Sequence, residues 1–547
     1  MAKIVELLRQ HKSEELWQLC CGFIDLDMDQ FMVIQRSLLH EQLHTLKNSV
    51  LANRIMEGLT PTTVDEFRRQ VPLTTYDDYC PELLEKREDV LPEKPYIWAH
   101  TSGRSGDYQF KWAPLTHRFV EELAILLYGT GIFASCEGKG DVSKAKFGAK
   151  IVYAVAPKPY ASGVFVHITQ QVVPSKYLPA LEKAETMTFE ERIREGFRLA
   201  LSSGFDYFFG LSTVLIAVGE QFSKQSNSTD MLRLLLEPRA LLRLSRGLIR
   251  SKSERRPMLP RDLWSVAGIM SGGADSTVLK ERIKSLWGRY PLETYACAEG
   301  GLLASQTWDY STMTFIPNLN FFEFIPEEEY FKHRNDKSYK PRTVLLNEVE
   351  PGKNYEIVIT NFHGGAMIRY RIGDMIRIVS LKNDNLGIKI PQMIFERRAD
   401  DLIDIGGFTR LTERIIWQAV ENTGIAYEDW VVRKEIVNKQ PKLRLYLELK
   451  DNSPGSKEEI TALIHSELKK LDSDYMNLEF ILNINPLSIS LLPRGTFQRY
   501  MERRQAEGAD LAHLKPPHIN PPEGALSLLG IKSTKKLPAK YPKKLKK

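Results

Sequence analysis

Cysteine is scarce in this sequence, and the few cysteines show no spacing typical of metal ligands. Among 547 residues there are only five: Cys20, Cys21, Cys80, Cys136 and Cys297. An odd number of scattered cysteines predicts free thiols, as in a reducing compartment. The pattern therefore argues against a cysteine-ligated metal centre.

Long apolar runs and a secretory leader are also lacking. No basic segment followed by an apolar one opens the chain. The longest uncharged apolar stretches, such as Tyr207–Gly219, fall short of the roughly 20 residues that a membrane helix needs. We therefore expect no integral membrane segment and a cytoplasmic location.

An excess of basic charge is lacking over most of the chain. The net charge is +6, but residues 531–547 contain eight lysines and no acid, so the remaining residues carry a net charge of −2. This balance argues against a basic nucleic-acid-binding body, and we expect no nucleic-acid partner. The Lys-rich tail, residues 531–547, is predicted to be disordered, with weak contact to acidic lipid or RNA as the alternative.

The composition is typical of a soluble globular protein, and the length requires more than one domain. Hydrophobic residues make up 43% and charged residues 26% of the chain, and 547 residues exceed what one core usually holds. Helices and strands are predicted to alternate, which indicates an α/β fold. Helices are expected over 1–58, most of 186–250 and 276–288, and strands over 151–156, 314–324, 354–360 and 375–380.

The pattern of predicted strands and helices changes after Arg398-Ala399-Asp400. Residues 401–450 predict a strand, a Gly-Gly turn, a helix and an alternating strand at 443–449, and a helix at 457–471 and a strand at 478–484 follow. We therefore predict a large N-terminal domain, residues 1–400, with β-sheets flanked by helices. A smaller, mobile α+β domain, residues 401–530, follows and precedes the tail.

The most informative motif is a short loop of small, hydroxylated and glycine residues, His100–Gly106. Glycine permits close approach and positive φ, so such a loop can turn its backbone N–H groups toward a phosphate. Lys111 follows as a mobile positive charge for the same phosphates. The motif predicts a phosphate-binding loop, with an ordinary surface turn as the alternative.

A second motif, Ser271–Ala274, follows an apolar run and precedes a predicted helix. A Gly-Gly pair at the end of a strand lets a flat ring lie against bare backbone, although a simple strand-to-helix turn has the same pattern. Residues 271–276 also match the phosphate loop of ATP pyrophosphatases, S-G-G-x-D-S. Both interpretations imply ATP.

The third motif is Tyr295–Gly300. An aromatic ring can stack on adenine while a nearby carboxylate holds Mg²⁺ through oxygen ligands. The alternative is a buried strand end with one exposed acid.

The fourth motif, Arg369–Asp374, places a carboxylate after a glycine turn, where it can accept both ribose hydroxyls. Arg397–Asp400 follows, and an arginine there can clamp ribose or phosphate with its planar fork. A surface Arg–Asp pair, worth little energetically, is the alternative. Near the end, Pro493–Phe497 and Leu514–His518 place Lys515 on a loop, either as a late-arriving cation or as a solvated lysine.

Taken in order, these motifs resemble the acyl-adenylate-forming superfamily, which includes acyl-CoA synthetases and luciferases. The chain is most similar to the auxin-responsive Gretchen Hagen family of acyl-acid amido synthetases, from about residue 60 to 520. The stretches that carry the resemblance are Thr63–Arg68, Val71–Leu73 with Tyr76, Thr101–Asp107, Tyr295–Glu299, Arg494–Phe497 and His513–His518. The last match is the most specific to the family.

The resemblance implies a role for each matching position. The phosphate loop Ser102, Gly103, Arg104, Ser105 and Gly106 would hold the ATP phosphates, with Ser102 counted among the catalytic residues. Gly273, Ala274 and Tyr295 would line the adenine, and Glu299 would hold Mg²⁺. Asp374 would bind the ribose with help from Arg398, and Lys515 would reach the adenylate.

Three positions depart from the family pattern. Arg104 replaces a threonine of the phosphate loop, Cys297 replaces a serine, and His518 replaces the closing arginine. These departures bear on activity more than on fold or nucleotide binding.

The function implied by the resemblance is ATP-dependent adenylation of a small carboxylic acid, followed by transfer of the acyl group to an amine such as an amino acid. ATP and Mg²⁺ would be the cofactors. Two alternatives stay open: a ligase that uses CoA or another thiol as acceptor, and a non-catalytic homologue that binds nucleotide or acyl acid. The sequence indicates neither the acid, the acceptor nor the oligomeric state.

Overall fold

The chain divides into two compact units, Met1–Asp400 and Asp401–Lys547. The computed structural model describes residues 2–101, 111–223, 238–272, 276–398, 403–405, 409–411, 413–437, 440–450, 456–482, 486–506, 516, 518–521 and 523–531. Each unit is described below by itself.

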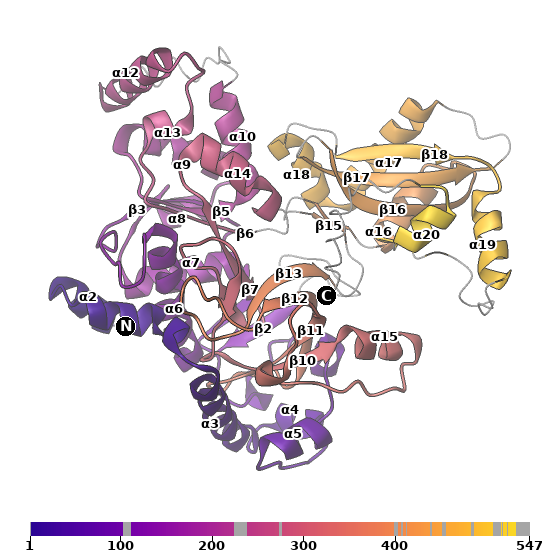
Figure 1. The fold of residues 1–547 in the computed structure, drawn as a ribbon, viewed down its shortest axis with the longest axis horizontal. Helices are drawn as coiled ribbons and strands as arrows, with labels where there is room; N and C mark the ends of the chain where they lie inside the picture. Colours follow the sequence, from indigo (N-terminus) through magenta and orange to yellow (C-terminus); the bar gives the residue numbers. More distant parts are fainter. Residues whose placement is uncertain are drawn as a thin grey trace, which may run out of the picture. The chain divides into compact units, whose positions relative to one another are not determined.

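Within the described residues, the first unit is built on an eleven-stranded sheet with the order β10-β11-β12-β13-β9-β8-β7-β6-β5-β3-β4 (Figure 1). Its strands are β3 (Lys150–Ala154), β4 (Lys176–Leu178), β5 (Tyr207–Leu211), β6 (Gly268–Gly272), β7 (Pro291–Cys297), β8 (Gly301–Ser305), β9 (Met313–Phe315), β10 (Asn320–Pro326), β11 (Asn354–Asn361), β12 (Tyr370–Ser380) and β13 (Gln392–Arg398). The half from β4 to β7 is parallel and the half from β7 to β10 is antiparallel. A separate hairpin pairs β1 (Ile97–His100) with β2 (Trp112–Leu115).

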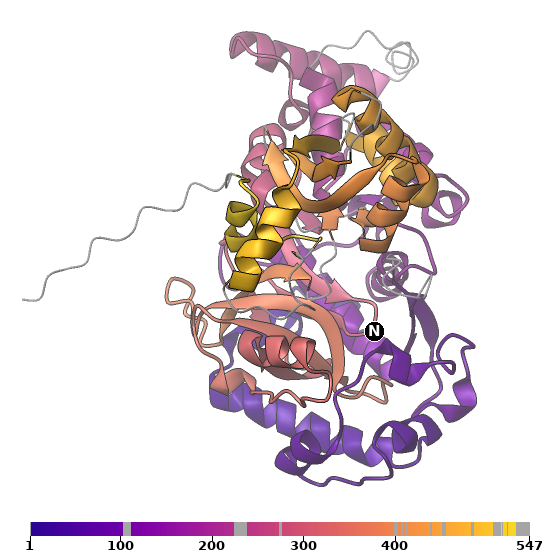
Figure 2. The same ribbon diagram turned by 90° about the vertical axis from the view of Figure 1, so that its right-hand side faces the viewer.

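Helices connect and cover these strands. They are α1 (Ala2–Arg9), α2 (Ser13–Cys21), α3 (Met28–Leu46), α4 (Val50–Ile55), α5 (Val64–Gln70), α6 (His117–Ser135), α7 (Ala161–Val172), α8 (Leu181–Ala184), α9 (Phe189–Ser203), α10 (Ser212–Ser223), α12 (Pro238–Ser253), α13 (Pro260–Leu263), α14 (Ser276–Trp287) and α15 (Glu327–Asn335). Helix α12 packs on α9 and α13 and lies at the outer end of the first unit in both views (Figures 1 and 2). None of the described helices has both the length and the apolar character of a bilayer-spanning segment.

Local sequence signals explain several of these elements. Thr63 caps α5 in a capping box, in which its hydroxyl accepts a hydrogen bond from the Glu66 N–H and the Glu66 carboxylate accepts one from the Thr63 N–H. The apolar stretch Tyr207–Gly219 is neither one helix nor a membrane segment. It forms the buried strand β5 and then begins α10, because a short apolar run bounded by breakers suits a parallel strand. The prediction that residues 186–250 are mostly helical is confirmed over the described part of that range, where α9, α10 and α12 lie and β5 is the strand between α9 and α10.

The second unit holds a three-stranded sheet with the order β16-β17-β18, and a small hairpin of β14 and β15. Its elements are β14 (Ile403–Ile405), β15 (Thr409–Leu411), α16 (Glu413–Asn422), β16 (Tyr427–Val437), β17 (Gln440–Leu449), α17 (Lys457–Leu471), α18 (Ser473–Leu482), β18 (Leu487–Leu492), α19 (Thr496–Ala506) and α20 (Glu523–Leu528). Its core lies between the sheet and α16, α17 and α18. The predicted helix at 457–471 is confirmed.

The predicted strand at 478–484 was wrong, because the residues up to Leu482 belong to α18. The side chain of Asp472 accepts a hydrogen bond from the backbone N–H of Tyr475 at 2.6 Å, and such a bond starts a helix. Tyr475 and Leu478 are both fully buried, at the i, i+3 spacing of one helix face. A short apolar run does not separate strand from helix by periodicity alone.

Candidate active site

The carboxyl ends of the central parallel strands lie together in the first unit. Ser271, near the end of β6, shares a 2.8 Å hydrogen bond with Ser212, which directly follows β5. In the ladder between β6 and β7, Ser271 is paired with Glu293, so Tyr295 lies two residues beyond it. Ligands of open α/β sheets bind at this edge, outside the carboxyl ends of the strands. The second and third sequence motifs therefore share one edge of the sheet.

Tyr295 and Asp374 are in direct contact. The Tyr295 hydroxyl donates a 2.9 Å hydrogen bond to Oδ2 of Asp374, and the two residues are only 6% and 5% exposed. The strands that carry them, β7 and β12, are not neighbours in the sheet, because β8, β9 and β13 lie between them. The sheet curls enough to bring them together. The sequence predicted both residues at the nucleotide but did not predict this bond.

Glu299 lies in the turn between β7 and β8 and is also bonded to β12. The Tyr370 hydroxyl donates to Oε1 of Glu299 at 3.0 Å. The side-chain amide of Asn361 donates to the Glu299 carbonyl at 2.9 Å, and the amide of Asn320 donates to the Gly300 carbonyl at 2.7 Å. A buried acid with several hydrogen bonds around it keeps a fixed position.

The two arginines of the fourth motif hold β12 in place. Arg369 forms a bidentate pair with Glu323, at 2.9 and 2.7 Å, and both side chains are buried. Arg371 forms a second bidentate pair with Glu356, at 3.0 and 2.7 Å. Such paired forks fix geometry as well as charge. Both arginines are therefore already paired, and they stabilise the strands around the site.

Cys297, which replaces the serine of the family pattern, is a protonated thiol at neutral pH. Burial, together with the negative charges of Glu299 and Asp374, holds the pKa of Cys297 well above its usual value. Burial and the charge of Glu299 also raise the pKa of Tyr370, which keeps its hydroxyl a hydrogen-bond donor. Because the thiolate is the nucleophilic form, Cys297 is not suited to covalent catalysis.

The base of the predicted phosphate loop is described, although residues 102–110 are not. The backbone N–H of Thr101 donates to the Lys111 carbonyl at 3.1 Å, and the N–H of Lys111 donates to the Thr101 hydroxyl at 3.3 Å. These bonds close the hairpin of β1 and β2 on either side of the loop. The loop therefore starts and ends at one point of the first unit.

A chain of contacts joins this hairpin to the strand that carries Asp374. The Trp112 N–H donates to the Tyr76 hydroxyl at 2.6 Å. Two residues earlier, Thr74 exchanges backbone hydrogen bonds of 2.9 Å with Arg369 and Arg371, which flank the start of β12. Segment 74–76 thus bridges the hairpin and β12, and the loop base and Asp374 belong to one connected region.

Most of the remaining predicted residues lie outside the described part of the chain. For Arg398 only the backbone is described, and it pairs with Asp374 in the ladder of β12 and β13. No cluster of three or more His, Cys, Asp or Glu residues that could hold a metal ion occurs within the described residues. The predicted role of Glu299 therefore stays a prediction, of the kind in which one carboxylate, substrate phosphates and water together hold Mg²⁺. The predicted positions outside the described residues are Ser102, Gly103, Arg104, Ser105, Gly106, Gly273, Ala274 and Lys515.

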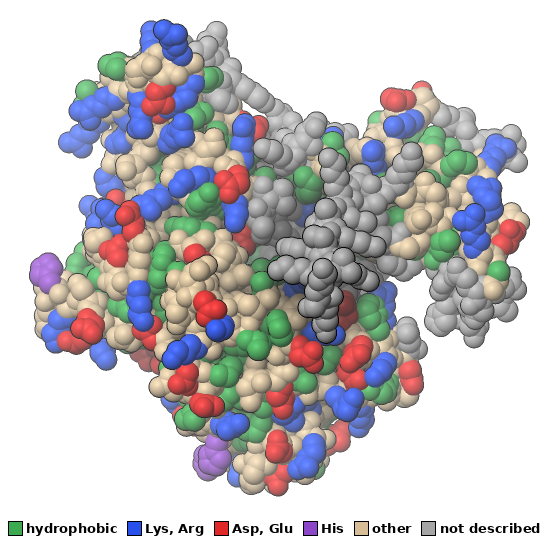
Figure 3. Space-filling model, viewed as in Figure 1, with side chains coloured by type: hydrophobic (Ala, Val, Ile, Leu, Met, Phe, Trp, Pro, Cys, Tyr) green, Lys and Arg blue, Asp and Glu red, His purple; other side chains and the backbone are tan. Residues whose placement is uncertain are grey.

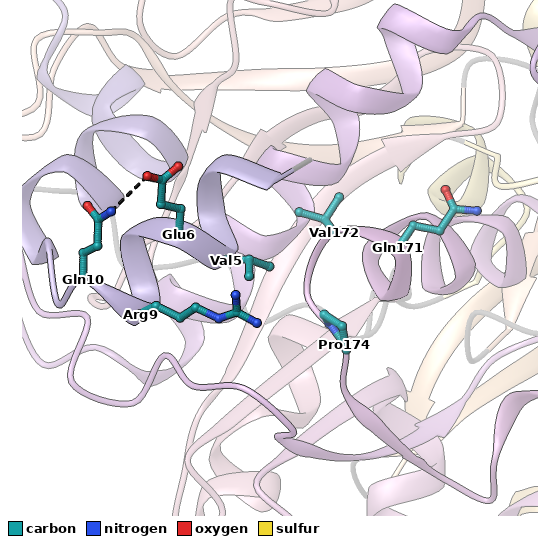
Figure 4. Close-up of a pocket in the computed structure, with 7 residues that line it drawn as sticks. All are labelled: Val5, Glu6, Arg9, Gln10, Gln171, Val172 and Pro174. Carbon is teal, nitrogen blue, oxygen red and sulfur yellow. Dashed lines mark hydrogen bonds between the residues drawn. The ribbon is translucent and has the colours of Figure 1, made fainter.

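A separate hollow of about 490 Å³ opens between α1 and the end of α7 (Figure 4). Val5, Glu6 and Arg9 of α1 line it. Gln10, which follows α1, also lines it and donates a 2.9 Å hydrogen bond to the Glu6 carboxylate. None of the residues that line it belongs to the four motifs. It is not the predicted nucleotide site.

In the second unit, His518 lies between two carboxylates. Its ring nitrogens contact Glu413 Oε1 at 2.5 Å and Asp429 Oδ1 at 2.8 Å, and its ring stacks on Trp430 with centroids 4.3 Å apart. Burial alone would lower the pKa of His518, but the hydrogen bonds and charges of Asp429 and Glu413 outweigh it and hold that pKa above its usual value. The two carboxylates therefore favour the charged form of His518, which links Glu413 at the start of α16 to Asp429 in β16.

Comparison with known proteins places the chain in one family. Residues 20–187 match the GH3 family N-terminal domain, 313–398 the GH3 family central domain and 412–523 the GH3 family C-terminal domain, and together they cover most of the chain. A jasmonoyl–L-amino acid synthetase, JAR4, of Nicotiana attenuata is 28% identical over 49% of this chain and 46% of its own length. An indole-3-acetic acid-amido synthetase, GH3.3, of Arabidopsis thaliana is 30% identical over 37% of this chain and 34% of its own. The matched part thus spans about half the length of the first relative and a third of the second.

Solved structures show the same fold. An acyl acid amido synthetase, AtGH3.15, solved in complex with 2,4-DB, superposes with a TM-score of 0.51 at 17% identity, over 93% of this chain and 95% of that chain. A 2-hydroxyisobutyryl-CoA ligase, solved with 2-HIB-AMP and CoA, gives a TM-score of 0.53 at 14% identity, over 85% and 86%. The three domain matches follow one another in order along this fold. The chain belongs to the GH3 family, the family that its motifs indicated.

Proposed function

We propose that this protein is an ATP-dependent ligase that adenylates a small carboxylic acid and then transfers the acyl group to an amine, such as that of an amino acid. The observation that carries the proposal is the buried pair of Tyr295 and Asp374 beside Glu299. Membership of the GH3 family and the names of its relatives as amido synthetases support the same reaction.

The main requirement of the reaction is that the site offsets the repulsion between negatively charged groups. In the first step the carboxylate of the acid attacks the α-phosphate of ATP, forms an acyl-AMP anhydride and releases pyrophosphate. Anionic oxygens must approach an anionic phosphate, so donors and cations aimed at the phosphate lower the barrier. In the second step the amine attacks the acyl carbon and AMP leaves.

The chain's residues divide this work between binding and orientation. Asp374, held by the Tyr295 hydroxyl, accepts the ribose hydroxyls and fixes the nucleoside. Glu299, oriented by Tyr370, would hold Mg²⁺, which supplies positive charge at the phosphates. The phosphate loop that includes Ser102 and Arg104 would supply backbone donors, and we keep Lys515 as the late-arriving cation. No protein nucleophile is needed, in agreement with the raised pKa of Cys297.

The domain roles and the location are part of the same proposal. Residues 1–400 would bind ATP and the acid, and residues 401–530 would act as the mobile lid. The division of the chain after Asp400 supports this assignment. All five cysteines are free thiols, which supports a reducing, cytoplasmic location.

The experiment is a screen for AMP release. The full chain is incubated with ATP, Mg²⁺, a panel of carboxylic acids, and either the twenty amino acids or CoA. We expect release that requires one acid and one amino acid, and an amide product by mass spectrometry. Release that requires CoA and yields a thioester would replace the amine by a thiol. No release with any acid would favour a non-catalytic binding protein.

A further inference from the structure

Helix α12 presents three distinct stripes of side chains. Ala240, Leu244, Gly247 and Ser251, at the i, i+4, i+7, i+11 spacing of one helix face, are buried. They attach the helix to the first unit, and a Cβ at Gly247 would lie 2.7 Å from the Leu263 side chain of α13. The other two stripes flank this buried face.

One outward stripe is apolar. Leu241 and Leu248 are 38% and 46% exposed, and Leu242 and Ile249 are 53% and 70% exposed. Each pair is spaced by seven residues, so the four side chains form one exposed strip along the helix. Exposed apolar side chains that lie next to one another are more typical of contact surfaces than single scattered ones.

A second row along the helix is basic: Arg239, Arg243, Arg246 and Arg250 follow one another at i, i+4, i+7 and i+11. Arg239, Arg246 and Arg250 are exposed. Arg243 is half-buried and donates hydrogen bonds to the Leu201 and Leu263 carbonyls at 2.9 and 3.0 Å, which hold it against the first unit. Between residues 238 and 256 there are seven basic side chains and one acid, Glu254. Figure 3 shows the blue lysine and arginine side chains gathered over α12, with green hydrophobic side chains among them.

The arginines line a hollow of about 290 Å³ next to the apolar strip. Arg239, Arg243 and Arg246 line it on one side, and Leu242 belongs both to the hollow and to the apolar strip. The hollow is also lined by Asp262, whose carboxylate is paired with Arg256. Burial and the neighbouring charge of Arg246 lower the pKa of Arg243. Among the described residues, Arg239 and Arg246 form no ion pair.

An exposed apolar strip beside a row of arginines matches the chemistry of an anionic membrane surface. The apolar side chains would enter the boundary between headgroups and acyl chains, and the exposed Arg239 and Arg246 would contact lipid phosphates. We propose that α12 docks this protein, lying flat, on membranes that contain anionic phospholipids. This surface shares no residue with the nucleotide site and is independent of the proposed function.

The test is sedimentation of the full chain with lipid vesicles. Vesicles of phosphatidylcholine alone are compared with vesicles that contain 30% phosphatidylserine, at about 0.1 M and 0.5 M salt. We expect binding to the anionic vesicles that is weakened by salt, and little binding to phosphatidylcholine alone. No sedimentation with anionic vesicles would overturn the proposal.

Two double variants assign the binding to α12. L248E/I249E removes the apolar strip, and R239E/R246E reverses the charge of two arginines that line the hollow. Each is expected to weaken vesicle binding by about tenfold or more. The first removes the burial of apolar side chains in the membrane, and the second removes the attraction of arginines to anionic lipids. The matched controls are L463E, at an apolar side chain of α17 that is 49% exposed, and K47E/K353E, at two exposed lysines outside α12.

Each outcome decides the proposal. Loss of binding in both α12 variants, with control-like thermal unfolding and full binding by the controls, supports it. Full binding by the α12 variants would overturn it and assign membrane contact to another part of the chain, such as the Lys-rich tail. If soluble phosphoserine binds but vesicles do not, or if α12 instead mediates self-association in sedimentation velocity, docking on lipid is likewise overturned.

Discussion

Carboxylates are held in two different ways in the two units of this protein. In the first unit, Asp374 and Glu299 each accept a hydrogen bond from a buried tyrosine, at 2.9 and 3.0 Å. In the second unit, Asp429 and Glu413 are bridged by a single histidine. A tyrosine hydroxyl stays a neutral donor throughout the physiological pH range, whereas a histidine gains or loses its charge within it.

The difference separates two acids that are oriented by neutral donors from two acids that share one charged partner. A neutral donor orients a carboxyl group without supplying a counter-charge, which leaves Asp374 and Glu299 suited to bind hydroxyls or a cation. A positive histidine offsets one of the two negative charges of its partners. We therefore expect changes in the first unit to alter catalysis, and changes at His518 to alter stability in a pH-dependent way.

The largest expected effect is at Asp374. D374A removes the ribose acceptor and should abolish acid-dependent AMP formation, to below about 1% of the wild-type rate. The measurement is AMP release under the conditions of the acid screen. The matched control is D384A, at an exposed aspartate paired only with Lys382 among the described residues, which should keep wild-type activity. Comparable activity in the two variants would remove Asp374 from the site.

Lys515 should have the next largest effect. K515A is expected to slow the adenylation step by about 10²–10³, the scale for losing one preorganised charge donor. Single-turnover kinetics with ATP and the acid measure this step. K450A, in the same unit, is the control, and a K515A enzyme that adenylates at the wild-type rate would exclude the lysine from the mechanism.

A smaller effect is expected from the tyrosine that orients Asp374. Y295F deletes one hydrogen bond to a charged group, so kcat/KM for ATP should fall by about 10-fold to 100-fold. The effect should nearly vanish in the background of D374N, since the two residues act as a unit. The control is Y128F, because the Tyr128 hydroxyl is buried and makes no hydrogen bond among the described residues. An equal fall in kcat/KM from Y295F in the wild-type and D374N backgrounds would show that Tyr295 does not act through Asp374.

The smallest expected effect is on stability. Its dependence on pH tests the contrast between carboxylates bonded to a tyrosine and carboxylates bonded to a histidine. The pKa of His518 is raised in the folded protein, so its charged form stabilises the fold fully below the unfolded pKa, and this contribution is lost as pH rises through the folded value. H518Q should therefore lower the free energy of unfolding by roughly 1 kcal/mol at pH 5.5 and by much less at pH 9.

Urea unfolding of the full chain at several pH values measures this difference. H40Q, at an exposed histidine of α3, is the control and should give a difference near zero at each pH. A constant difference between wild type and H518Q across pH 5.5–9 would contradict a stabilising role of the charged histidine.

Local signals allowed much of the fold to be predicted. The helix predicted at 457–471 has the observed bounds of α17, and the capping box of Thr63 and Glu66 shows how a local signal fixes the start of α5. The same approach failed at α18, where the helix depends on the cap at Asp472 and on packing of Tyr475 rather than on periodicity.

The candidate site could be predicted only in part. Motifs pointed to Tyr295, Glu299 and Asp374 one by one, because each type of side chain suits a part of ATP. The bond between Tyr295 and Asp374 joins strands separated by three others in the sheet, and so depends on how the sheet curls. No spacing along the chain encodes that curvature.

Exchange of labelled pyrophosphate into ATP tests the central claim most directly, because it reports the first half-reaction without any acceptor. The account predicts that the wild-type chain catalyses this exchange with Mg²⁺ and at least one carboxylic acid, and that D374A does not. Exchange in D374A at the wild-type rate would contradict the assignment of the nucleotide to the site formed by Tyr295, Glu299 and Asp374.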